Sequence, residues 1–506
     1  MVSKESLTDA APASGQAVAV IDIGSNSGRV AVFQRDPGGH LRAIAGSRAS
    51  LRLVDDVDRR GEFTEATMAR ATEALRDFKA IALSAGASRI VAVATAAVRE
   101  ASNGTLFAER LQRELGIRID VITGAEEAHY GFTGAMRGLS VSSGLLFDVG
   151  GGSMELTRFE RRRRGDDVSL PLGALRLSEG FLETDPPKRP QLRRLRDHVR
   201  RHLRKAGVAK LPKDDCLVGT GGTLRNLAKI DREAQGYPIT SLHGYVLPSD
   251  RLADIVDQLA RMKEKDRDRL PGLSAERADS IVGGAVAIDT LAEFVRARYL
   301  VVSGQGVRQG LALGLLGITT GSLETIKEAA LASLVARFGG WTREAAARRE
   351  SVAATLYRAI EPRGPVILNA AVRHAAGVLD IGRAVDIVNR HRHVADILLT
   401  AELTGFTHAE LALLCAVVRR AGDRHADIRS LAAIGGIGAK FVERAAIILC
   451  LADEIEARCP PGQPIAIRSE INRNVTLSIP VLPSWLEQGL EKRFERAFGR
   501  ELIVRR

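Results

Sequence analysis

Two turns in the sequence carry residues that could hold a phosphate chain. The first follows the apolar run Val18–Ile21 and reads Asp22-Ile23-Gly24-Ser25-Asn26-Ser27, and the second follows Gly144–Phe147 and reads Asp148-Val149-Gly150-Gly151-Gly152-Ser153. Each turn is Asp-x-Gly followed by small residues at the end of a predicted buried strand. Backbone N–H groups in such a turn bind an oxyanion, and the aspartate can bind a cation or a water. Two such turns facing each other would hold a phosphate chain from both sides.

Two further glycine turns follow predicted strands later in the chain. They read Gly219-Thr220-Gly221-Gly222-Thr223 and Ser303-Gly304-Gln305-Gly306. Leu224 stands where a dinucleotide-binding fingerprint needs its third glycine, and the sequence contains no Gly-Lys dipeptide of a Walker A loop. Any one of these turns, taken alone, is more typical of a tight strand-to-helix connection than of a ligand site.

Charged residues near the turns could complete a site for phosphoryl transfer. Releasing a terminal phosphoryl group requires charge neutralisation, positioning of the chain and a water aimed in line. Asp22, Asp148 and Glu155 are predicted at strand ends, where carboxylates can hold Mg²⁺ among phosphates. Arg99 follows the predicted strand Ile90–Ala94 and could clamp a phosphate in bidentate fashion. The alternatives are Asx-turn capping for the two aspartates and a surface ion pair for Arg99.

Together the four turns resemble the phosphate-binding and connecting motifs of the actin, sugar-kinase and Hsp70 superfamily. Within that superfamily, six short sequence motifs resemble those of the exopolyphosphatase and guanosine pentaphosphate phosphohydrolase (Ppx/GppA) family. These motifs are Ile21–Ser27, Ala94–Gly104, Gly124–Ala128, Asp148–Leu156, His243–Tyr245 and Ser303–Arg308. The resemblance covers roughly residues 17–315 and is weaker over the remainder.

The resemblance implies an α/β fold in which two ribonuclease-H-like lobes, as in actin-like ATPases, form a cleft. It also implies a catalytic glutamate that orients or deprotonates the attacking water. By its place directly before Ala128, Glu127 matches that glutamate, and Glu126 would point in another direction on a helix. Without the flanking motifs, either glutamate would read as a surface acid of a helix. Mg²⁺ is the implied cofactor, with Asp148 and Glu155 as its ligands.

The expected phosphate-binding residues come from the turns and from Arg99. Hydroxyl groups, backbone N–H groups and the guanidinium would donate hydrogen bonds to the chain. The residues are Asp22, Gly24, Ser25, Asn26, Ser27, Arg99, Gly150, Gly151, Gly152, Ser153, Gly219, Thr220, Gly221, Gly222 and Thr223.

Composition restricts the class of protein and of partner. The 506 residues are enough for about three domains, and the net charge of +12 predicts a polyanionic partner or an Arg-rich protein with an ordinary solvated surface. Aromatic residues make up only 4%, which disfavours base stacking as the main mode of binding. Four cysteines without a CxxC pair indicate reduced thiols, and no apolar stretch approaches the length of a membrane span. These features predict a cytoplasmic protein.

The pattern of elements predicts the domain organisation. Residues 1–16 are expected to form a disordered tail, 17–140 a first actin-like lobe and 141–318 a second one, because strands and helices alternate there. Residues 319–459 are rich in Ala, Leu, Arg and Glu with helical periodicity and predict a helical domain. Residues 460–506 predict a small C-terminal segment with strands at 465–467 and 475–479 and a helix at 485–498.

The predicted helical domain faintly resembles the HD-type domain of longer members of the family. None of the ten histidines precedes an aspartate, so the metal-binding His-Asp dipeptide is missing. Partial remnants could be His391–Asp396 and Leu451–Asp453. The domain is therefore interpreted as a degenerate HD-like platform for dimerisation or polyanion binding. His391 and His393 are expected to be interface or surface residues rather than ligands.

Two basic clusters lie outside the motifs. Arg161–Arg164 is predicted on a hairpin turn, and Lys188–Lys205 predicts a basic helix. Such clusters are usually solvated faces, but they could also guide a long polyanion toward the cleft.

The leading hypothesis is an exopolyphosphatase that releases terminal orthophosphate from inorganic polyphosphate with Mg²⁺. The alternatives are a pppGpp 5′-phosphohydrolase of the same family, a dual activity, and a non-catalytic sensor of (p)ppGpp or polyphosphate. The intact carboxylate set argues against the sensor. The expected partners are polyphosphate and, in the alternatives, pppGpp or ppGpp, with neither nucleic acid nor a membrane. The resemblance also implies a homodimer.

Overall fold

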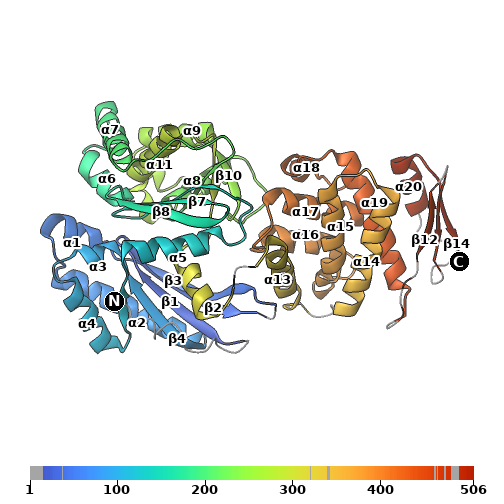
Figure 1. Cartoon of the computed structure of the whole chain (residues 1–506), viewed down its shortest axis with the longest axis horizontal. Helices are drawn as coiled ribbons and strands as arrows, with labels where there is room; N and C mark the ends of the chain where they lie inside the picture. The colour runs from blue at the N-terminus through green and yellow to red at the C-terminus, as the bar shows by residue number, and fades with distance from the viewer. Residues whose placement is uncertain are drawn as a thin grey trace. The chain divides into compact units, whose positions relative to one another are not determined.

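The chain divides into two compact units (Figure 1). The computed structural model describes residues 15–36, 38–319, 321–338, 342–460, 463, 465, 467–471, 474–479 and 489–505, so the predicted disordered tail lies outside the description except for its last two residues. One unit comprises the chain to Gly236 together with Leu242–Ala329, and the other comprises Tyr237–Ser241 together with the chain from Ala330 onward. No helix in the described residues is long and apolar enough to cross a membrane. The four cysteines are free thiols, as predicted.

The first unit begins with a five-stranded sheet. Its order is β3-β2-β1-β4-β5, in which β1, β2 and β3 pair antiparallel and β4 and β5 continue parallel to β1. The strands are β1 (Ala17–Ile23), β2 (Ser27–Arg35), β3 (Leu41–Ser50), β4 (Ala87–Ala94) and β5 (Ile119–Val121). One face of the sheet packs its apolar residues on the long helix α2, where Met68, Leu75 and Phe78 recur at helical spacing and are buried. The helices in this part of the chain are α1 (Leu53–Arg60), α2 (Glu65–Ser84), α3 (Ala96–Glu100), α4 (Gly104–Leu115) and α5 (Gly124–Met136). The buried residues Phe132 and Met136 of α5 pack on the second sheet rather than on the first.

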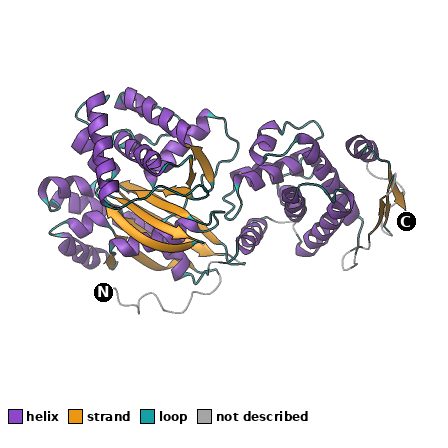
Figure 2. Cartoon of the chain, turned by 45° about the horizontal axis from the view of Figure 1, so that its top comes forward, coloured by secondary structure: helices purple, strands orange, loops and turns teal. Residues whose placement is uncertain are grey.

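The second sheet repeats the order of the first. Its six strands run β10-β11-β9-β6-β7-β8, so that three antiparallel strands are again followed by two parallel ones, and β10 adds an antiparallel edge strand. The strands are β6 (Gly144–Val149), β7 (Met154–Glu160), β8 (Arg163–Leu170), β9 (Cys216–Thr220), β10 (Tyr245–Pro248) and β11 (Tyr299–Val302). Arg161 and Arg162 form the β7–β8 hairpin turn, as predicted. Figure 2 shows the strands of this unit at its centre with helices around them.

Helices cover the second sheet, and one of them returns to the first. The helical elements are α6 (Ala174–Phe181), α7 (Arg189–Lys205), α8 (Gly222–Ala234), α9 (Ser249–Arg261), α10 (Glu264–Arg267), the 3₁₀ helix η2 (Ala275–Arg277), α11 (Ile281–Val295) and α12 (Val307–Leu315). The predicted boundaries assign α12 to the second lobe. In the structure, Leu311 and Leu315 of α12 instead pack with Val18 and Val20 of β1, because the helix crosses back over the first sheet.

The crossing of α12 over α5 depends on glycines. A Cβ atom on Gly310 would lie 2.0 Å from the carbonyl oxygen of Tyr130, and one on Gly134 would lie 2.0 Å from that of Gly306. Both distances are far inside van der Waals contact, so the two helices pack backbone against backbone.

We expect Gly310→Ala to destabilise the first unit by about 3 kcal/mol, because the added methyl group must push α12 away from α5. Gly314 is the matched control, since it lies on the same helix and a methyl group added there would have no other atom within 4 Å. Gly314→Ala should raise the stability by about 0.5–1 kcal/mol through its higher helix propensity. Thermal unfolding of both variants checks this, and equal melting temperatures would contradict the close crossing.

The second unit is mainly helical, as predicted for residues 319–459. Its helical elements are α13 (Leu323–Val335), which begins before the unit boundary, α14 (Arg343–Ile360), α15 (Val366–Val378), the 3₁₀ helix η3 (Leu379–Ala384), α16 (Arg390–Thr400), α17 (His408–Gly422), α18 (Arg429–Gly435), α19 (Ala439–Ala457) and α20 (Leu490–Phe498). A small sheet of order β12-β13-β14 follows, with β12 (Arg468–Ile471), β13 (Val475–Ser478) and β14 (Leu502–Arg505). The predicted strand at 475–479 is present as β13, and α20 forms the described part of the helix predicted at 485–498. The strand predicted at 465–467 is not seen at Ile465 or Ile467, since β12 begins at Arg468, and Ala466 and residues 485–488 lie outside the description.

Arginines surround the predicted HD remnants. Arg349 is fully buried, pairs with Asp380, and lies 3.0 Å from Asp453 (Nη1 to Oδ1). Arg390 pairs with the same two aspartates. Guanidinium groups thus neutralise the carboxylate of the Leu451–Asp453 remnant. His391 is half-buried and packs against Gly422 within the unit rather than on an open surface, and burial lowers its pKa to about 4 with help from the Arg390 charge.

Candidate active site

The first Asp-x-Gly turn joins β1 to β2. Asp22 is the last residue but one of β1, and the turn closes with the N–H of Gly24 donating to the carbonyl of Ser27 at 3.2 Å. The carbonyl of Asn26 accepts from the N–H groups of Leu51 and Arg52, which fixes the turn against the end of β3. The small side chains of Ser25 and Asn26 are buried there.

The second turn is built in the same way at the end of β6. The N–H of Gly150 donates to the carbonyl of Ser153 at 3.0 Å, and Asp148 lies directly opposite Glu155 on β7. The carbonyls of Gly150 and Gly151 accept from the first N–H groups of α6. The turn therefore brings two carboxylates to neighbouring strand positions.

The third turn places glycines against the second. Gly221 has a φ of +93°, and a Cβ on it would lie 2.5 Å from Oδ1 of Asp148, so only glycine fits this position. Gly219 has a different role, because a Cβ there would lie 2.3 Å from the ring of Phe147. This position allows the strand to pack against the core.

The turns and α5 line one pocket. Of the residues expected from the sequence, those lining it are Asp22, Gly24, Ser25, Asn26, Ser27, Glu127, Asp148, Gly150, Gly151, Ser153, Glu155, Thr220, Gly221 and Gly222. Arg99, Gly152, Gly219 and Thr223 are not among the lining residues. Thr223 is fully buried in α8, and Gly152 lies behind the turn against Val54 and Ser25.

The two adjacent glutamates of α5 have different surroundings. Glu126 accepts from the N–H and hydroxyl of Thr123 at 2.8 and 2.9 Å, and the Thr123 hydroxyl accepts from the N–H of Glu126, which is a capping box. Glu127 lines the pocket, and its buried Oε2 has no hydrogen-bond partner in the described part of the chain. The helix cap thus occupies Glu126 and leaves Glu127 available to a water or a phosphate.

Arg99 lies behind Glu127. Its Nη1 is 3.6 Å from Oε2 of Glu127 and donates to the carbonyl of Ile122 at 2.7 Å. The guanidinium is therefore placed to hold the glutamate, and the predicted phosphate clamp stays a prediction.

The carboxylates of the pocket resist ionisation. Burial raises the pKa of Glu127 well above its ordinary value, and the charges of Glu155 and Asp22 raise it further, while Arg99 lowers it. Burial, with the nearby Asp148 charge, raises the pKa of Glu155 to about 7. The pKa values of Asp22 and Asp148 are raised mainly by burial as well, against the lowering effect of nearby arginines. A cation bound among these groups would relieve their mutual repulsion.

We expect Arg99→Met to move the acid limb of the pH dependence of kcat/KM to higher pH. Glu127 accepts a proton only when ionised, and the Arg99 charge lowers its pKa. Removing that charge raises the pKa, so activity is lost at a higher pH on acidification. Rates of orthophosphate release between about pH 5 and 9 check this. Arg113→Met is the control, because Arg113 is an exposed arginine on α4. An unmoved limb would indicate that Arg99 does not act through Glu127.

The donor set suits a divalent cation, although it forms no complete cage. Among the described residues, no group of three or more His, Cys, Asp or Glu side chains lies at metal-binding spacing. Asp148 and Glu155 are opposite each other on adjacent strands, and Asp22 lines the same pocket. Mg²⁺ commonly binds through one or two carboxylates plus phosphate oxygens of the substrate, and this arrangement offers such ligands.

Four arginines enter the pocket from outside the predicted set. They are Arg29 on β2, Arg225 on α8, Arg277 on η2 and Arg308 on α12. Burial lowers the pKa of Arg225 to about 9, and that of Arg277 and of Arg308 to about 10, and in each case the Arg29 charge lowers it further. The acids that flank Arg277 in the sequence, Glu276 and Asp279, pair with Arg48 and Arg52 instead. Within the described residues, Nε of Arg277 is buried without a hydrogen-bond partner. The pocket therefore gathers four guanidinium groups with the four carboxylates of Asp22, Glu127, Asp148 and Glu155.

The family follows from a comparison with known proteins. The sequence model of the Ppx/GppA phosphatase family matches residues 31–318, more than half of the chain. The chain belongs to this family. Exopolyphosphatase 1 of Mycobacterium leprae is 33% identical over 298 residues, which cover 58% of this chain and 88% of that protein. Exopolyphosphatase 2 of Mycobacterium tuberculosis is 33% identical over 316 residues, which cover 59% of this chain and 98% of that protein.

Solved structures of the family match the same part of the chain. The Aquifex aeolicus member superposes with a TM-score of 0.52 at 30% identity and covers 59% of this chain and 96% of its own. An exopolyphosphatase from Cytophaga hutchinsonii has a TM-score of 0.55 at 24% identity, covering 61% of this chain and all of its own, and supports the fold. The matched family region ends at residue 318, before the helical unit.

Motif reasoning misses the four arginines for different reasons. Arg308 is the last residue of the Ser303–Arg308 motif, and Arg29 lies two residues beyond the Ile21–Ser27 motif. Both arginines therefore lie in or next to a motif that can be recognised in the sequence. Arg225 likewise lies two residues beyond the Gly219–Thr223 turn. Arg277 comes from a segment without a phosphate-binding motif, and only the fold brings it to the pocket.

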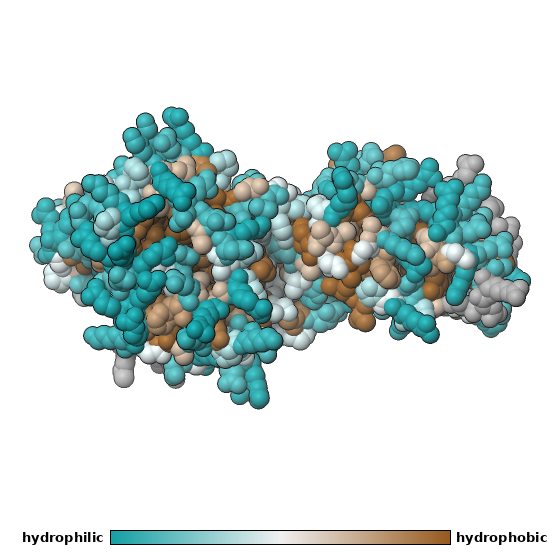
Figure 3. Space-filling view, turned by 90° about the horizontal axis from the view of Figure 1, so that it is seen from above, coloured by the Kyte–Doolittle hydropathy of each residue, from teal (hydrophilic) through white to brown (hydrophobic). Residues whose placement is uncertain are grey.

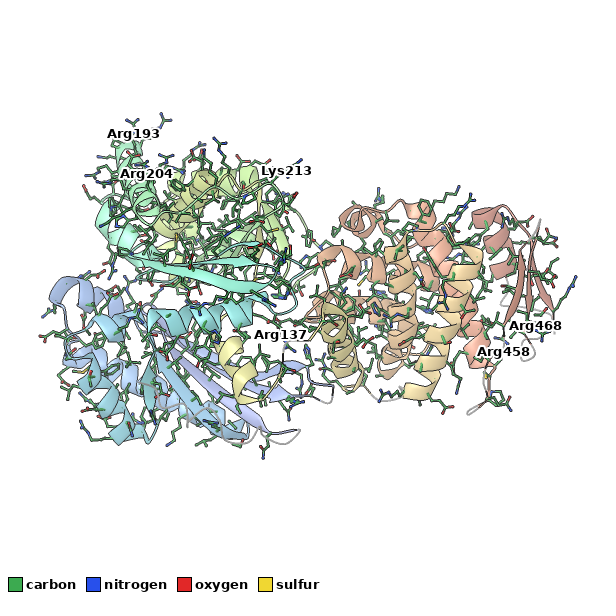
Figure 4. All side chains as sticks on the ribbon, in the orientation of Figure 1. Arg137, Arg193, Arg204, Lys213, Arg458 and Arg468 are labelled. Carbon is green, nitrogen blue, oxygen red and sulfur yellow. The ribbon has the colours of Figure 1, made fainter. Side chains whose placement is uncertain are left out.

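The basic helix is present but lies outside the pocket. α7 begins at Arg189 and ends at Lys205, and Arg193 and Arg204 project from it into solvent (Figure 4). Side chains on the face drawn in Figure 3 are mainly hydrophilic over the first unit. The guiding role of α7 for a polyanion stays a prediction.

Proposed function

We propose that this protein is an exopolyphosphatase, which hydrolyses terminal phosphoanhydride bonds of inorganic polyphosphate. The observation that carries the proposal is the clustering of four arginines with Glu127 and three further carboxylates in one pocket. Guanidinium groups bind phosphate through charge-assisted hydrogen bonds, and a phosphate chain supplies one negative charge after another. The relatives from Mycobacterium leprae and Mycobacterium tuberculosis carry the name exopolyphosphatase, which favours this substrate over pppGpp.

The residues of the pocket divide the work of hydrolysis. Glu127 is placed to accept a proton from the attacking water, since its Oε2 lacks another partner among the described residues and its raised pKa makes it a stronger base. The turns that begin at Gly24 and Gly150 offer N–H and hydroxyl donors to the terminal phosphate. Arg277 and Arg308 would neutralise charge on the transferring group and on the chain behind it.

Mg²⁺ is the cofactor that we propose, held by Asp148 and Glu155 with the help of Asp22. When bound, it would supply charge neutralisation for the phosphate oxygens. The carboxylates would then be held ionised, and Glu127 would keep its own position through Arg99 and the start of α5.

The finer structural features that the resemblance implies are also proposals. The repeated strand order supports two ribonuclease-H-like lobes. The arginine-paired Asp380 and Asp453 support a degenerate HD-like helical unit without catalysis. A cytoplasmic homodimer rests on the resemblance alone.

Release of orthophosphate by purified protein tests the function. The protein would be given Mg²⁺ and, in parallel, long-chain polyphosphate, tripolyphosphate or pppGpp. We expect release from polyphosphate that stops on addition of EDTA and returns with excess Mg²⁺. Release from pppGpp alone would overturn the substrate assignment, and no release from any of the three would overturn the enzyme.

A further inference from the structure

A row of positive side chains leads from the pocket to the edge of the first sheet. In the strand register, Asp22 lies opposite Arg29, and Arg29 lies opposite Arg48. Residues directly opposite on neighbouring strands point to the same face. Strands are about 4.8 Å apart, so the row from Asp22 to Arg48 spans about 10 Å. It begins at a pocket carboxylate and ends outside the pocket lining.

A second row runs along α8. Arg225 lines the pocket, and Lys229 follows it by one helical turn, which is about 6 Å along the axis. Arg29 of the first row and Arg225 of the second both line the pocket, so the two rows meet there. Burial lowers the pKa of Lys229, and the charges of Arg232, Arg225, Arg29 and Arg48 lower it further. The ammonium group of Lys229 therefore adds a further positive charge beside the arginines.

One carboxylate stands at the outer end of these rows. Glu276 pairs with Nη1 of Arg48, while Nε of Arg48 is buried without a partner among the described residues. The segment that carries Glu276 is anchored on α8, where Oδ1 of Asn226 accepts from the N–H of Ser274 at 2.8 Å. Like charges directly opposite on a sheet are destabilising, and Asp22 and Glu276 are the acids beside Arg29 and Arg48 in the substrate-free protein.

We propose that Arg48 and Lys229 extend the arginine cluster into an exit track for the phosphate chain, and that Glu276 occupies its outer end until a long chain displaces it. The inference rests on the proposed function, because the ligand of the track is the distal part of the same polyphosphate. Short chains are held by the pocket alone. Long chains also contact the track, which makes Arg48, Lys229 and Glu276 determinants of chain-length preference.

Chain-length dependence of kcat/KM tests the track. We expect Lys229→Met and Arg48→Gln each to lower the ratio of kcat/KM for long-chain polyphosphate to that for tripolyphosphate by about tenfold, as for the loss of one charge-assisted contact. Glu276→Gln should raise this ratio, because the track loses its competing carboxylate. Lys213→Met is the control, since Lys213 is exposed and belongs to neither row (Figure 4). It should leave the ratio as in the wild type.

Salt dependence and direct binding give independent readouts. Each lost phosphate contact should reduce the slope of log Kd for long-chain polyphosphate against log salt concentration by about one. Unchanged ratios and slopes in both Lys229→Met and Arg48→Gln would overturn the track. A lower ratio in Glu276→Gln would instead assign Glu276 to holding the two lobes together, and would overturn its role as a competitor.

The two proposals fail in different ways. A wild-type protein without orthophosphate release contradicts the proposed function, and its Kd values for long chains still test the track. An active wild type whose track variants behave like Lys213→Met contradicts the track alone.

Discussion

Replacing Glu127 by glutamine lowers kcat for orthophosphate release by about a thousandfold, which is the range expected for the loss of a general base. The amide cannot accept the proton of the attacking water, but it retains the size and the hydrogen-bonding capacity of the side chain. Glutamine also removes one of several repelling carboxylates, so the affinity for polyphosphate should be maintained or rise. Single-turnover rates and equilibrium binding of long-chain polyphosphate separate the two effects.

Glu126→Gln is the matched control for this result. Glu126 caps its own helix, and glutamine at this position can still form the capping box, so the stability should fall by no more than about 0.5 kcal/mol through the lost charge at the helix N-terminus. Its kcat should stay near that of the wild type, because the side chain accepts from Thr123 and does not line the pocket. A near-normal rate for Glu127→Gln combined with an inactive Glu126→Gln would show that the neighbouring glutamate is the base.

Arg277→Met should lower kcat/KM for polyphosphate about a hundredfold and, at the same time, raise the melting temperature of the substrate-free protein. A hundredfold loss corresponds to about 2.7 kcal/mol, within the range for charge-assisted hydrogen bonds. The stability rises because Arg277 is buried, its Nε lacks a partner among the described residues, and the neighbouring Arg29 and Arg48 repel it. Steady-state kinetics and thermal unfolding without substrate measure the two quantities.

Arg267 provides the opposite case on a nearby segment. It is also buried, but it donates to the carbonyls of Ala278 and Met262 at 2.8 Å each and pairs with Asp185 at 2.9 Å. Arg267→Met leaves those acceptors unsatisfied and should cost about 3 kcal/mol of stability. If both variants were destabilised alike, Arg277 would be a structural residue rather than one held in place for a ligand.

The sequence predicts the turns of the site better than its arginines. Asp22 and Asp148 lie in short sequence motifs whose glycines and hydroxyl residues are the types that a phosphate-binding turn requires. These turns can therefore be predicted from the sequence without knowledge of the fold. The spacing of Thr123 and Glu126, three residues apart, is that of a capping box, and this spacing is visible in the sequence. It supports the choice of Glu127 rather than Glu126 as the general base. Arg277 lies on a segment whose role depends on the packing of the second lobe, and no local spacing indicates it.

In the fold, too, the elements that depend on local spacing can be predicted from the sequence, whereas the packing of α12 cannot. Helical spacing of Met68, Leu75 and Phe78 predicts α2, and the strands that carry the turns are continuous apolar runs. The path of α12 could not be read in this way. The helical spacing of its apolar residues does not say which sheet they cover, and their packing with Val18 and Val20 of β1 is seen only in the fold.

The return of α12 has a consequence for how the chain is synthesised and divided. The first sheet begins at Ala17, but one of its faces is covered by Leu311, Leu315 and Ile318, which come much later in the chain. During translation this face stays open until the whole second lobe has emerged from the ribosome. A fragment that ends near residue 140 would leave Val18, Val20 and Phe33 without their covering helix. The two lobes therefore form one folding unit, and expression of the first lobe alone should give aggregation rather than a soluble domain.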